Sequence, residues 1–546
     1  MRSSVAIALL CLFVTPAVGT PVAVGPPAAA PATDTASPAV SIHAVYPNPV
    51  AGGDTGEFVV LDVSEDANLG AYALSDGRSV APLPNETATG TVALTAAPET
   101  VRPLVDHPVV GLAGHPELAN SGEDIRLLRD GTVVDSVRYT DATEGEIGVV
   151  SGSAIRWRPL GRTDRPVVTA RGGTVRAFTL PDAPGAPLEP LRRADRRVLL
   201  AGYTLSSARV ADALVAAERR GARVRVLLEG EPVGERTRAE ARTLDRLVEA
   251  GVEVRLVAGP RARYRYHHAK YAVADGRAVV LTENWKPAGT GGNSSRGWGV
   301  VTTQSSVVEG LATTFRADAG WQDGTAWDSY RRGRQFERGE RAVGSYEQRF
   351  EPTSVPVQRT ELLVTPDNAQ ERLLTVLDGA DDRIAVVQPT VGGWDEPLLR
   401  ALRRAAKRGV EVRLLLSDAW YVREENRKTV ERFREWADRT DTPLSARVAD
   451  PAGRYEKIHA KGAVVDDSVV VGSLNWNEQA ATENREVLLL VHGTEVASYY
   501  RRVFDADWQG GTGGLPLELL GIALGVGVLA ILALRRVEFA EKARRR

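Results

Sequence analysis

The spacing of apolar residues divides this chain of 546 residues into regions of different character. From Ser41 to Arg158, short apolar runs such as GEFVVLDV alternate with Gly, Asn and Asp. Short apolar runs that are separated by turn residues are typical of an all-β sandwich. The range 41–158 is therefore expected to form a β-sandwich, and it contains no cluster of titratable residues.

From about residue 190, near-continuous apolar runs alternate with amphipathic segments, and this pattern occurs twice. The segment ERRGARVRVLL of the first copy matches AKRGVEVRLLL of the second. Such runs, when they alternate with helices, are typical of a mostly parallel sheet that is covered on both faces. The repeat therefore predicts an α/β fold of two lobes, 190–345 and 346–507, which each supply half of one site.

The ends of the chain have the patterns of export and membrane anchoring. Residues 1–19 combine Arg2, an apolar stretch and small residues, as a signal peptide does, and a Pro/Ala-rich linker follows at 20–40. Residues 515–534 are apolar and precede a basic tail at 535–546, which favours a transmembrane helix with the tail in the cytoplasm. A buried terminal helix is the alternative. The sequence thus predicts an exported protein whose folded domains lie outside the cell membrane.

Two further segments are expected to connect these parts: a linker with docking strands at 159–189 and a Gly-rich spacer at 508–514. The net charge of -2 gives no whole-molecule field that would favour nucleic acid or an anionic surface. The single cysteine, Cys11, lies in the predicted signal peptide, so the mature chain has no disulfide and no cysteine metal site. The basic cluster from Arg261 to His268 fits either a site for a polyanion backbone or lipid headgroup or an ordinary structural role, and the mixed-charge cluster from Arg331 fits a solvated surface segment.

The chain contains seven lysines, and two of them stand two residues after a histidine in matching places of the repeat. These pairs are His268 with Lys270 and His459 with Lys461. In an extended strand, residues i and i+2 point to the same face, so each pair is expected to face one cleft. A neutral histidine can attack phosphorus, a protonated one can donate to the leaving oxygen, and lysines stabilise the developing negative charge. The pairs therefore predict a phosphodiester site that needs no metal and no other cofactor.

The second copy reads His459-x-Lys461-x4-Asp466, then Gly-Ser473-x-Asn475, and later Glu486. This string resembles the signature of the phospholipase D superfamily, and the resemblance covers about residues 190–507. It implies a duplicated, two-lobed α/β/α sandwich and a covalent phosphohistidine intermediate that water or an alcohol resolves. It also implies that Asp466 is a local orienter, that Ser473 and Asn475 are neutral donors, and that Glu486 fixes a histidine tautomer.

The first copy keeps His268, Lys270 and Asp275 at the same spacing, with Asn284 as a further donor. It departs from the signature in having Leu-Thr-Glu-Asn at 281–284 and in lacking a glutamate where the second copy has Glu486. The nucleophile is therefore left open, although the resemblance favours His268 as nucleophile and His459 as acid. His267, on the opposite face of the strand, is expected to be structural.

The expected function follows from the phospholipase D resemblance, from a second resemblance in the N-terminal region and from the predicted membrane anchor. The marks GEFVVL and LANSGEDIRLL in 41–158 resemble the lamin tail domain, an immunoglobulin-like module whose partner the sequence does not name. The membrane anchor favours phospholipid as the phosphodiester substrate, for hydrolysis or phosphatidyl transfer. A metal-independent extracellular nuclease of the same superfamily is the first alternative. A non-catalytic surface binding module is the second, and the retention of both His-x-Lys pairs argues against it.

Overall fold

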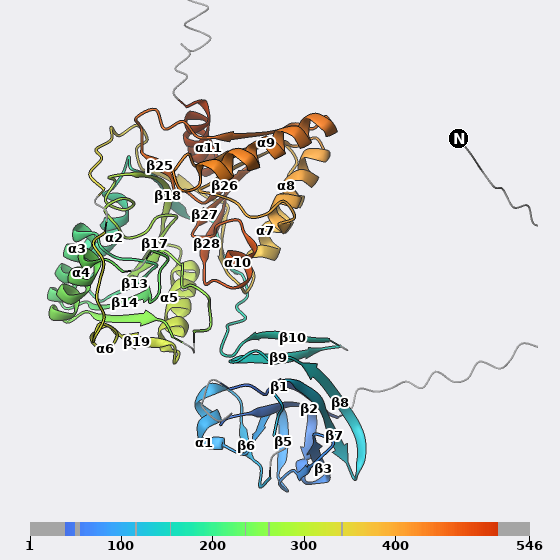
Figure 1. Ribbon diagram of the computed structural model, residues 1–546. Helices are drawn as coiled ribbons and strands as arrows, with labels where there is room; N and C mark the ends of the chain where they lie inside the picture. The colour runs from blue at the N-terminus through green and yellow to red at the C-terminus, as the bar shows by residue number, and fades with distance from the viewer. Residues whose placement is uncertain are drawn as a thin grey trace, which may run out of the picture.

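The computed structural model describes residues 39–49, 55–114, 117–152, 154–234, 236–259, 262–339 and 342–510. It comprises a β-rich N-terminal domain followed by two lobes of helices packed on sheets (Figure 1). The predicted signal peptide, the apolar segment 515–534 and the basic tail lie outside the described residues. Within the described ranges, no helix combines the length and the apolar character needed to cross a membrane.

The N-terminal domain contains two sheets in which most neighbouring strands are antiparallel. The first has the order β10-β9-β1-β2-β5-β6, with β1 (Val40–Tyr46), β2 (Phe58–Asn68), β5 (Thr87–Thr95), β6 (Val109–Gly111), β9 (Glu146–Ser151) and β10 (Ala154–Pro159). The second has the order β4-β3-β7-β8, with β3 (Tyr72–Ser75), β4 (Val80–Pro82), β7 (Gly122–Arg129) and β8 (Thr132–Thr140). A short helix, α1 (Pro98–Val101), precedes β6.

The core of this domain lies between its two sheets. Val59 and Leu61 of β2 are buried together with Ile125 and Leu127 of β7. Each pair is separated by one residue, which is the spacing at which strand side chains share a face. The prediction that the N-terminal region is β-rich is confirmed.

The first lobe is built on a sheet with the order β19-β15-β14-β13-β16-β17-β18-β12-β20. Its strands are β12 (Thr174–Leu180), β13 (Arg197–Gly202), β14 (Arg223–Glu229), β15 (Glu253–Val257), β16 (Tyr271–Ala274), β17 (Arg277–Leu281), β18 (Ser295–Thr302), β19 (Gly324–Ala326) and β20 (Thr353–Pro356). Helices α3 (Ala208–Arg219) and α4 (Arg238–Glu249) share one core with this sheet, beside the short α2 (Glu189–Arg192) and α6 (Trp327–Tyr330). Helix α5 (Ser305–Gly320) packs on the other face.

The second lobe repeats this plan on a sheet with the order β11-β21-β28-β27-β26-β22-β23-β24. Its strands are β11 (Val168–Arg171), β21 (Arg359–Val364), β22 (Arg383–Gln388), β23 (Glu411–Leu416), β24 (Leu444–Val448), β26 (Gly462–Val465), β27 (Ser468–Gly472) and β28 (Val487–His492). Helices α7 (Ala369–Asp378), α8 (Pro397–Lys407), α9 (Arg423–Thr440) and α10 (Glu478–Thr482) share one core. Helix α11 (Thr494–Gln509) joins the central core, which also contains α5 and the inner faces of both sheets.

The expectation of a mostly parallel sheet is wrong, because most neighbouring strands in both lobes are antiparallel. Parallel pairing joins β13, β14 and β15 in the first lobe and β22, β23 and β24 in the second. The strands that follow the two His-x-Lys pairs instead form tight hairpins, β16 with β17 and β26 with β27. A connection of two residues can join antiparallel strands only. The long apolar runs therefore reflect burial on both faces, and not parallel order.

The segment 159–189, expected to be a linker with docking strands, supplies one edge strand to each lobe. β11 pairs with β21 in the second lobe, and β12 pairs with β18 in the first. β20, from the start of the second copy, also crosses over and pairs with β12 in the first lobe. The two copies are thus interlocked and share one central core (Figure 1).

Candidate active site between the two lobes

Backbone hydrogen bonds between the lobes hold the histidines of the two His-x-Lys pairs in place. The N–H of His268 donates to the carbonyl of Arg485 at 2.9 Å, and the N–H of His459 donates to the carbonyl of Arg296 at 3.0 Å. The two-residue strand β25 (Lys457–Ile458), just before His459, pairs with the start of β18. The structure therefore brings the two His-x-Lys pairs together, as the repeat predicts.

Each histidine and its lysine are on one side of the chain, and the alanine between them is on the other. Ala269 and Ala460 are fully buried in the central core. Lys270 and Lys461 are 0% and 2% exposed. Their Nζ atoms donate to the carbonyls of His268 and His459 at 2.6 Å and 2.8 Å. The predicted alternation of side chains is therefore observed in both copies.

A carboxylate from the second lobe holds His268. Nδ1 of His268 lies 2.9 Å from both Oε1 and Oε2 of Glu486, and Asn484 donates to Oε1 at 3.1 Å. Burial lowers the pKa of His268 to about 4, and Glu486 opposes that shift. His268 is therefore neutral at pH 7, with Nδ1 protonated toward Glu486 and a lone pair on Nε2.

A carboxylate that the sequence reasoning missed lies beside His459. Oε2 of Glu283 is 3.2 Å from Nδ1 of His459, an ion-pair distance without hydrogen-bond geometry. Nδ1 of His459 and Oε1 of Glu283 are both buried without a hydrogen-bond partner. Burial raises the pKa of Glu283 to about 7. Burial, and then Lys461, lower the pKa of His459 well below its ordinary value.

The site concentrates lysine in a chain that otherwise uses arginine. Lys461, Lys270, Lys457 and Lys286 all oppose the raised pKa of Glu283, so four of the chain's seven lysines act on one carboxylate. Burial lowers the pKa of Lys461 to about 8. Clustered ammonium groups that are removed from water favour an anionic ligand, because such a ligand restores the charge balance.

The two motif segments also contain neutral polar side chains, namely two hydroxyls and two asparagine amides. The hydroxyls of Ser473 and Thr282 accept from the backbone N–H of Val487 and Trp298 at 3.0 Å and 2.9 Å. Both hydroxyls therefore help to hold the next strand. Because a hydroxyl that accepts one hydrogen bond can also donate one, the role of Ser473 as a donor in the site stays a prediction.

The two asparagines of the motifs lie three residues after the ends of β17 and β27 and remain candidates for ligand contact. Asn284 and Asn475 are both half-buried. The Oδ1 atom of Asn284 is buried without a hydrogen-bond partner. An unpaired buried amide oxygen is costly unless a ligand or water satisfies it.

The aspartates of the two motifs lie away from the histidines, in the hairpin turns. Asp275 accepts hydrogen bonds from the backbone N–H groups of 195–197 at 2.9–3.1 Å. Asp466 accepts in the same way from 381–383 at 2.9–3.0 Å. A strand of four residues, about 13 Å long, separates Asp275 from Lys270. Both aspartates orient the backbone, which is the role that the sequence assigned to them.

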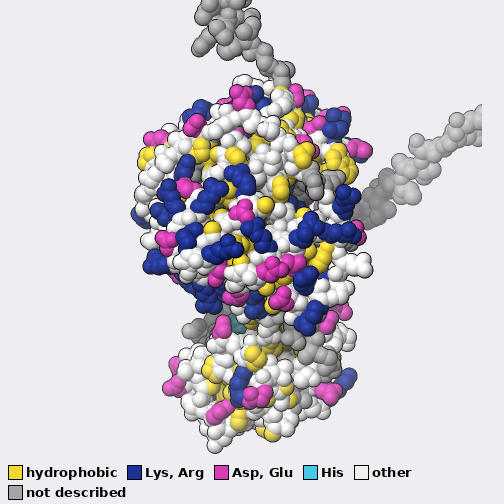
Figure 2. Space-filling model, turned by 90° about the vertical axis from the view of Figure 1, so that its left-hand side faces the viewer, with side chains coloured by type: hydrophobic (Ala, Val, Ile, Leu, Met, Phe, Trp, Pro, Cys, Tyr) yellow, Lys and Arg dark blue, Asp and Glu magenta, His cyan; other side chains and the backbone are white. Residues whose placement is uncertain are grey.

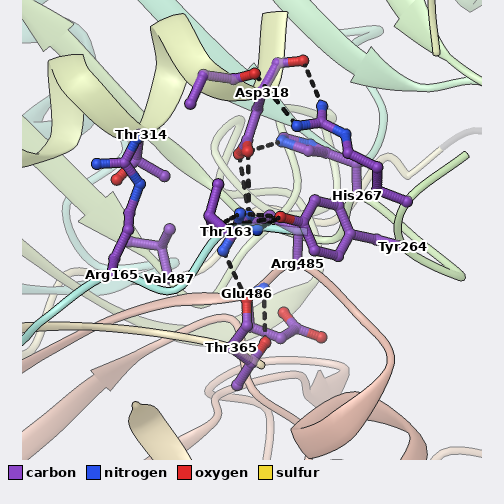
Figure 3. A network of polar contacts seen from close by, with 12 residues as sticks. Thr163, Arg165, Tyr264, His267, Thr314, Asp318, Thr365, Arg485, Glu486 and Val487 are labelled. Carbon is purple, nitrogen blue, oxygen red and sulfur yellow. Dashed lines mark hydrogen bonds and ion pairs between the residues drawn. The ribbon is translucent and has the colours of Figure 1, made fainter. Parts of the chain in front are cut away.

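A buried arginine network behind the site connects both lobes to the segment after the N-terminal domain (Figure 3). Arg485 contacts Asp318 of α5 at 3.1 Å, Asp367 at 3.4 Å and the hydroxyls of Tyr264 and Thr163. Nε2 of His267 also contacts Asp318, at 3.3 Å. His267 is therefore structural, as expected, and Arg485 fixes the chain next to Glu486.

The first lobe contains a matching network around Arg296. This arginine is fully buried and pairs with Asp182 and with Asp507 of α11, the latter at 2.9 Å. Sequence reasoning missed both networks. In the sequence, each network is marked by one arginine at the start of an apolar segment: Arg296 in SRGWGVV and Arg485 in NREVLLL.

In each of the two basic clusters of the sequence, one arginine is paired with an aspartate. Arg263 is buried and paired with Asp323 at 2.9 Å, so it is not available to a polyanion. On the face over α3, α4 and α6, acidic side chains lie among the basic ones (Figure 2). Arg331 pairs there with Asp245 at 2.9 Å. Among the described residues, no group of three or more His, Cys, Asp or Glu is arranged to hold a metal ion.

Comparison with known proteins gives three kinds of match. The profile of the family described as "Cardiolipin synthase, PLD-like domain" matches residues 188–319 and 373–508. Mitochondrial cardiolipin hydrolase of Xenopus laevis is 30% identical over 165 residues, which are 29% of this chain and 71% of that protein. The Mus musculus protein of the same name is 40% identical over 53 residues, 10% of this chain and 24% of that protein.

Solved structures also resemble the two lobes. Phosphatidylserine synthase of Haemophilus influenzae Rd KW20 is 12% identical, with a TM-score of 0.46, over 60% of this chain and 84% of that chain. Nuc, a phospholipase D family member of Salmonella typhimurium, is 18% identical, with a TM-score of 0.25, over 28% of this chain and 97% of that chain.

Proposed function

Since the chain belongs to the phospholipase D superfamily and is a phosphodiesterase of that superfamily, we propose that it cleaves phospholipids through a phosphohistidine on His268. One observation carries the mechanism. Glu486 binds Nδ1 of His268 with both oxygens, so that Nε2 keeps its lone pair, and His459 lies close enough for its pKa to respond to His268. A held nucleophile opposite a second imidazole is the arrangement that in-line phosphoryl transfer needs.

The proposed reaction has two steps that restore the enzyme. In the first, Nε2 of His268 bonds to phosphorus, the bond to the leaving oxygen breaks with its electron pair, and that oxygen takes a proton from His459. In the second, water or an alcohol gives a proton to His459 and attacks phosphorus, and the P–N electron pair returns to His268. Lys270 and Lys461 stabilise the negative oxygens in both steps.

The substrate itself supplies the condition under which His459 carries its proton. In the free protein, burial and Lys461 lower the pKa of His459. A bound phosphodiester brings a negative charge to the same lysines, and an opposite charge nearby favours the protonated imidazole. Protonation of the acid is therefore coupled to substrate binding.

An exposed aromatic pair beside the site supports a lipid substrate. Trp420 and Tyr421 follow β23, are 78% and 49% exposed, and contact each other edge-on at 5.5 Å. Nζ of Lys457, two residues before His459, lies 5.3 Å from the Tyr421 ring centroid. Tryptophan and tyrosine favour membrane interfaces, where one end of the ring is apolar and the other is hydrated. The Xenopus laevis relative, 71% of whose length matches this chain, is named a mitochondrial cardiolipin hydrolase.

The test uses the full chain in excess chelator, with vesicles of cardiolipin and phosphatidylcholine, with single-stranded DNA and with a soluble chromogenic phosphodiester. We expect vesicle hydrolysis that His268→Ala and His459→Ala abolish. Trp420→Ala should lower vesicle turnover about fivefold and leave the soluble substrate unchanged, while Val80→Ala, another exposed apolar position, changes neither. Turnover of DNA without turnover of lipid would replace the phospholipase proposal with the nuclease.

We also propose that the chain is exported and anchored by residues 515–534, with both lobes outside the membrane. The support is the pattern of the two apolar segments and the basic tail. Protease added to intact cells should release both lobes while the tail stays protected. Release of the protein by salt alone would contradict the anchor.

For the N-terminal domain we propose an immunoglobulin-like, lamin-tail-like module that binds a partner or acts as a spacer. Its two packed sheets and the segments GEFVVL and LANSGEDIRLL support this reading. A chain that lacks residues 41–158 should keep its turnover on the soluble phosphodiester. A loss of that turnover, with folded lobes, would assign the domain a part in catalysis.

A further inference from the structure

The duplication identifies which position of the first lobe corresponds to Glu486. Arg296 and Arg485 are both fully buried, and each carbonyl accepts the N–H of the opposite histidine. The strand registers agree, because Leu281 pairs with Gly299 in the first lobe and Gly472 pairs with Leu488 in the second. The residue after Arg296 therefore matches Glu486, and that residue is Gly297.

The space above Gly297 is occupied by the side chain of Glu283. A Cβ atom on Gly297 would lie 2.2 Å from Cγ and 2.7 Å from Oε1 of Glu283. The second lobe has Leu474 at the position of Glu283, and Leu474 is buried in an apolar core. A Leu and Glu pair in one lobe thus corresponds to a Glu and Gly pair in the other.

We propose that Glu283 is the positioning residue for His459 and that its carboxylate replaces the one that the duplicated motif would place at residue 297. Nδ1 of His459 has no hydrogen-bond partner in the structure, and Oε2 of Glu283 lies 3.2 Å from it. A small rotation of either side chain lets Glu283 accept the Nδ1 proton, so that Nε2 exchanges protons with the leaving and attacking oxygens. Gly297 is the necessary partner of this exchange, because any side chain there would displace the carboxylate. The inference rests on the proposed function, since it assigns a role within the same reaction.

The two carboxylates hold their histidines differently. Glu486 engages Nδ1 of His268 with both oxygens at 2.9 Å, whereas Glu283 approaches Nδ1 of His459 with one oxygen at 3.2 Å. The ordinary carboxylate position thus serves the ring that bonds to phosphorus, and the relocated one serves the ring that gains and loses a proton in each turnover. Loss of Glu283 should therefore slow proton transfer and leave substrate binding intact.

The experiment compares Glu283→Leu, Gly297→Glu and the double variant Glu283→Leu/Gly297→Glu, which copies the arrangement of the second lobe. Glu283→Leu should lower kcat by about 10²-fold with KM changed less than about threefold, because acid–base catalysis has that order of effect. Gly297→Glu alone should also be impaired, owing to the clash. The double variant should recover at least about tenfold over Glu283→Leu.

A trapping measurement and two controls separate this inference from the proposed function. Quenched Glu283→Leu should still form phosphohistidine on His268 but more slowly than the parent, because both formation and release of the intermediate need proton transfer by His459. Glu456→Gln, a change at an exposed glutamate nearby, should keep parental kcat, and melting temperatures should confirm folding. A parent without turnover or phosphohistidine overturns the proposed function. An active parent with parental kcat in Glu283→Leu, or a folded double variant no better than Glu283→Leu, overturns the inference alone.

Discussion

The Asp275 carboxylate should contribute to stability and not to chemistry, although it belongs to the defining motif. It sits at a positive φ of 51° in the turn between β16 and β17 and accepts three backbone N–H groups at the start of β13. Asp275→Asn keeps a side chain that tolerates this conformation and loses the charge and one acceptor. Asp275→Ala loses all three acceptors and adds the strain of a left-handed residue.

The magnitude follows from those contacts. Hydrogen bonds at this partly exposed edge contribute about 0.5–1 kcal/mol each after exchange with water, and a left-handed alanine costs about 1 kcal/mol. Asp275→Asn should therefore cost about 1–2 kcal/mol and Asp275→Ala about 3 kcal/mol. For a cooperative unit of about 150–250 residues, 3 kcal/mol lowers Tm by roughly 6–12 °C.

Thermal unfolding and steady-state kinetics at 20 °C on the same samples make the test. We expect kcat/KM of each folded variant within about threefold of the parent. The backbone donors lower the pKa of Asp275 even though burial raises it, so its contribution is present above its unfolded pKa and is lost as pH falls through the folded value. The stability gap between parent and Asp275→Asn should close in acid. A stable Asp275→Asn without turnover would refute the reasoning.

Three further outcomes follow from the geometry. The pKa of His268 is about 4 and that of Lys461 is about 8, so kcat/KM on the soluble phosphodiester should rise as pH passes 4 and fall as pH passes 8. Lys461→Arg should move the fall to higher pH. Arg485→Met should cost about 3–5 kcal/mol in urea unfolding, because it leaves Asp318 buried without its main cation, and an unchanged midpoint would contradict the network. Ser473→Ala should cost about 1–2 kcal/mol and keep kcat within about fivefold, because its hydroxyl serves the backbone, whereas a far larger loss of kcat would assign it to the substrate.

The local chemistry of the site was readable from the sequence because it depends on spacing within three consecutive residues. His459, Ala460 and Lys461 lie between β25 and β26, where Ala460 enters the central core and Nζ of Lys461 bonds to the carbonyl of His459. Glu283 was missed because it occupies the variable position of its motif, and no periodicity marks a side chain that crosses over to a glycine on the next strand. Arg485 was missed as a link between lobes because its partner Asp318 is far away in the sequence, and such pairing depends on tertiary contacts.

For the sheets, too, the sequence predicted local features but not the pairing of strands that are far apart in the chain. Apolar runs correctly indicated strands that are buried on both faces, but burial does not distinguish parallel from antiparallel neighbours. The turn at Asp275 decides that question, since a two-residue connection reverses the chain. The crossing of β11 and β20 between lobes leaves no mark in hydrophobicity, because edge strands have the same apolar pattern in either sheet.

The contact between His268 and Glu486 spans 218 residues of sequence and has a consequence for biosynthesis. A ribosome synthesises His268 long before Glu486, and it synthesises β11 long before β21, with which β11 pairs. A nascent or proteolytically shortened chain that ends before Arg485 therefore lacks both the carbonyl and the carboxylate that hold His268. The site is complete only after the second copy has been synthesised and has folded onto the first.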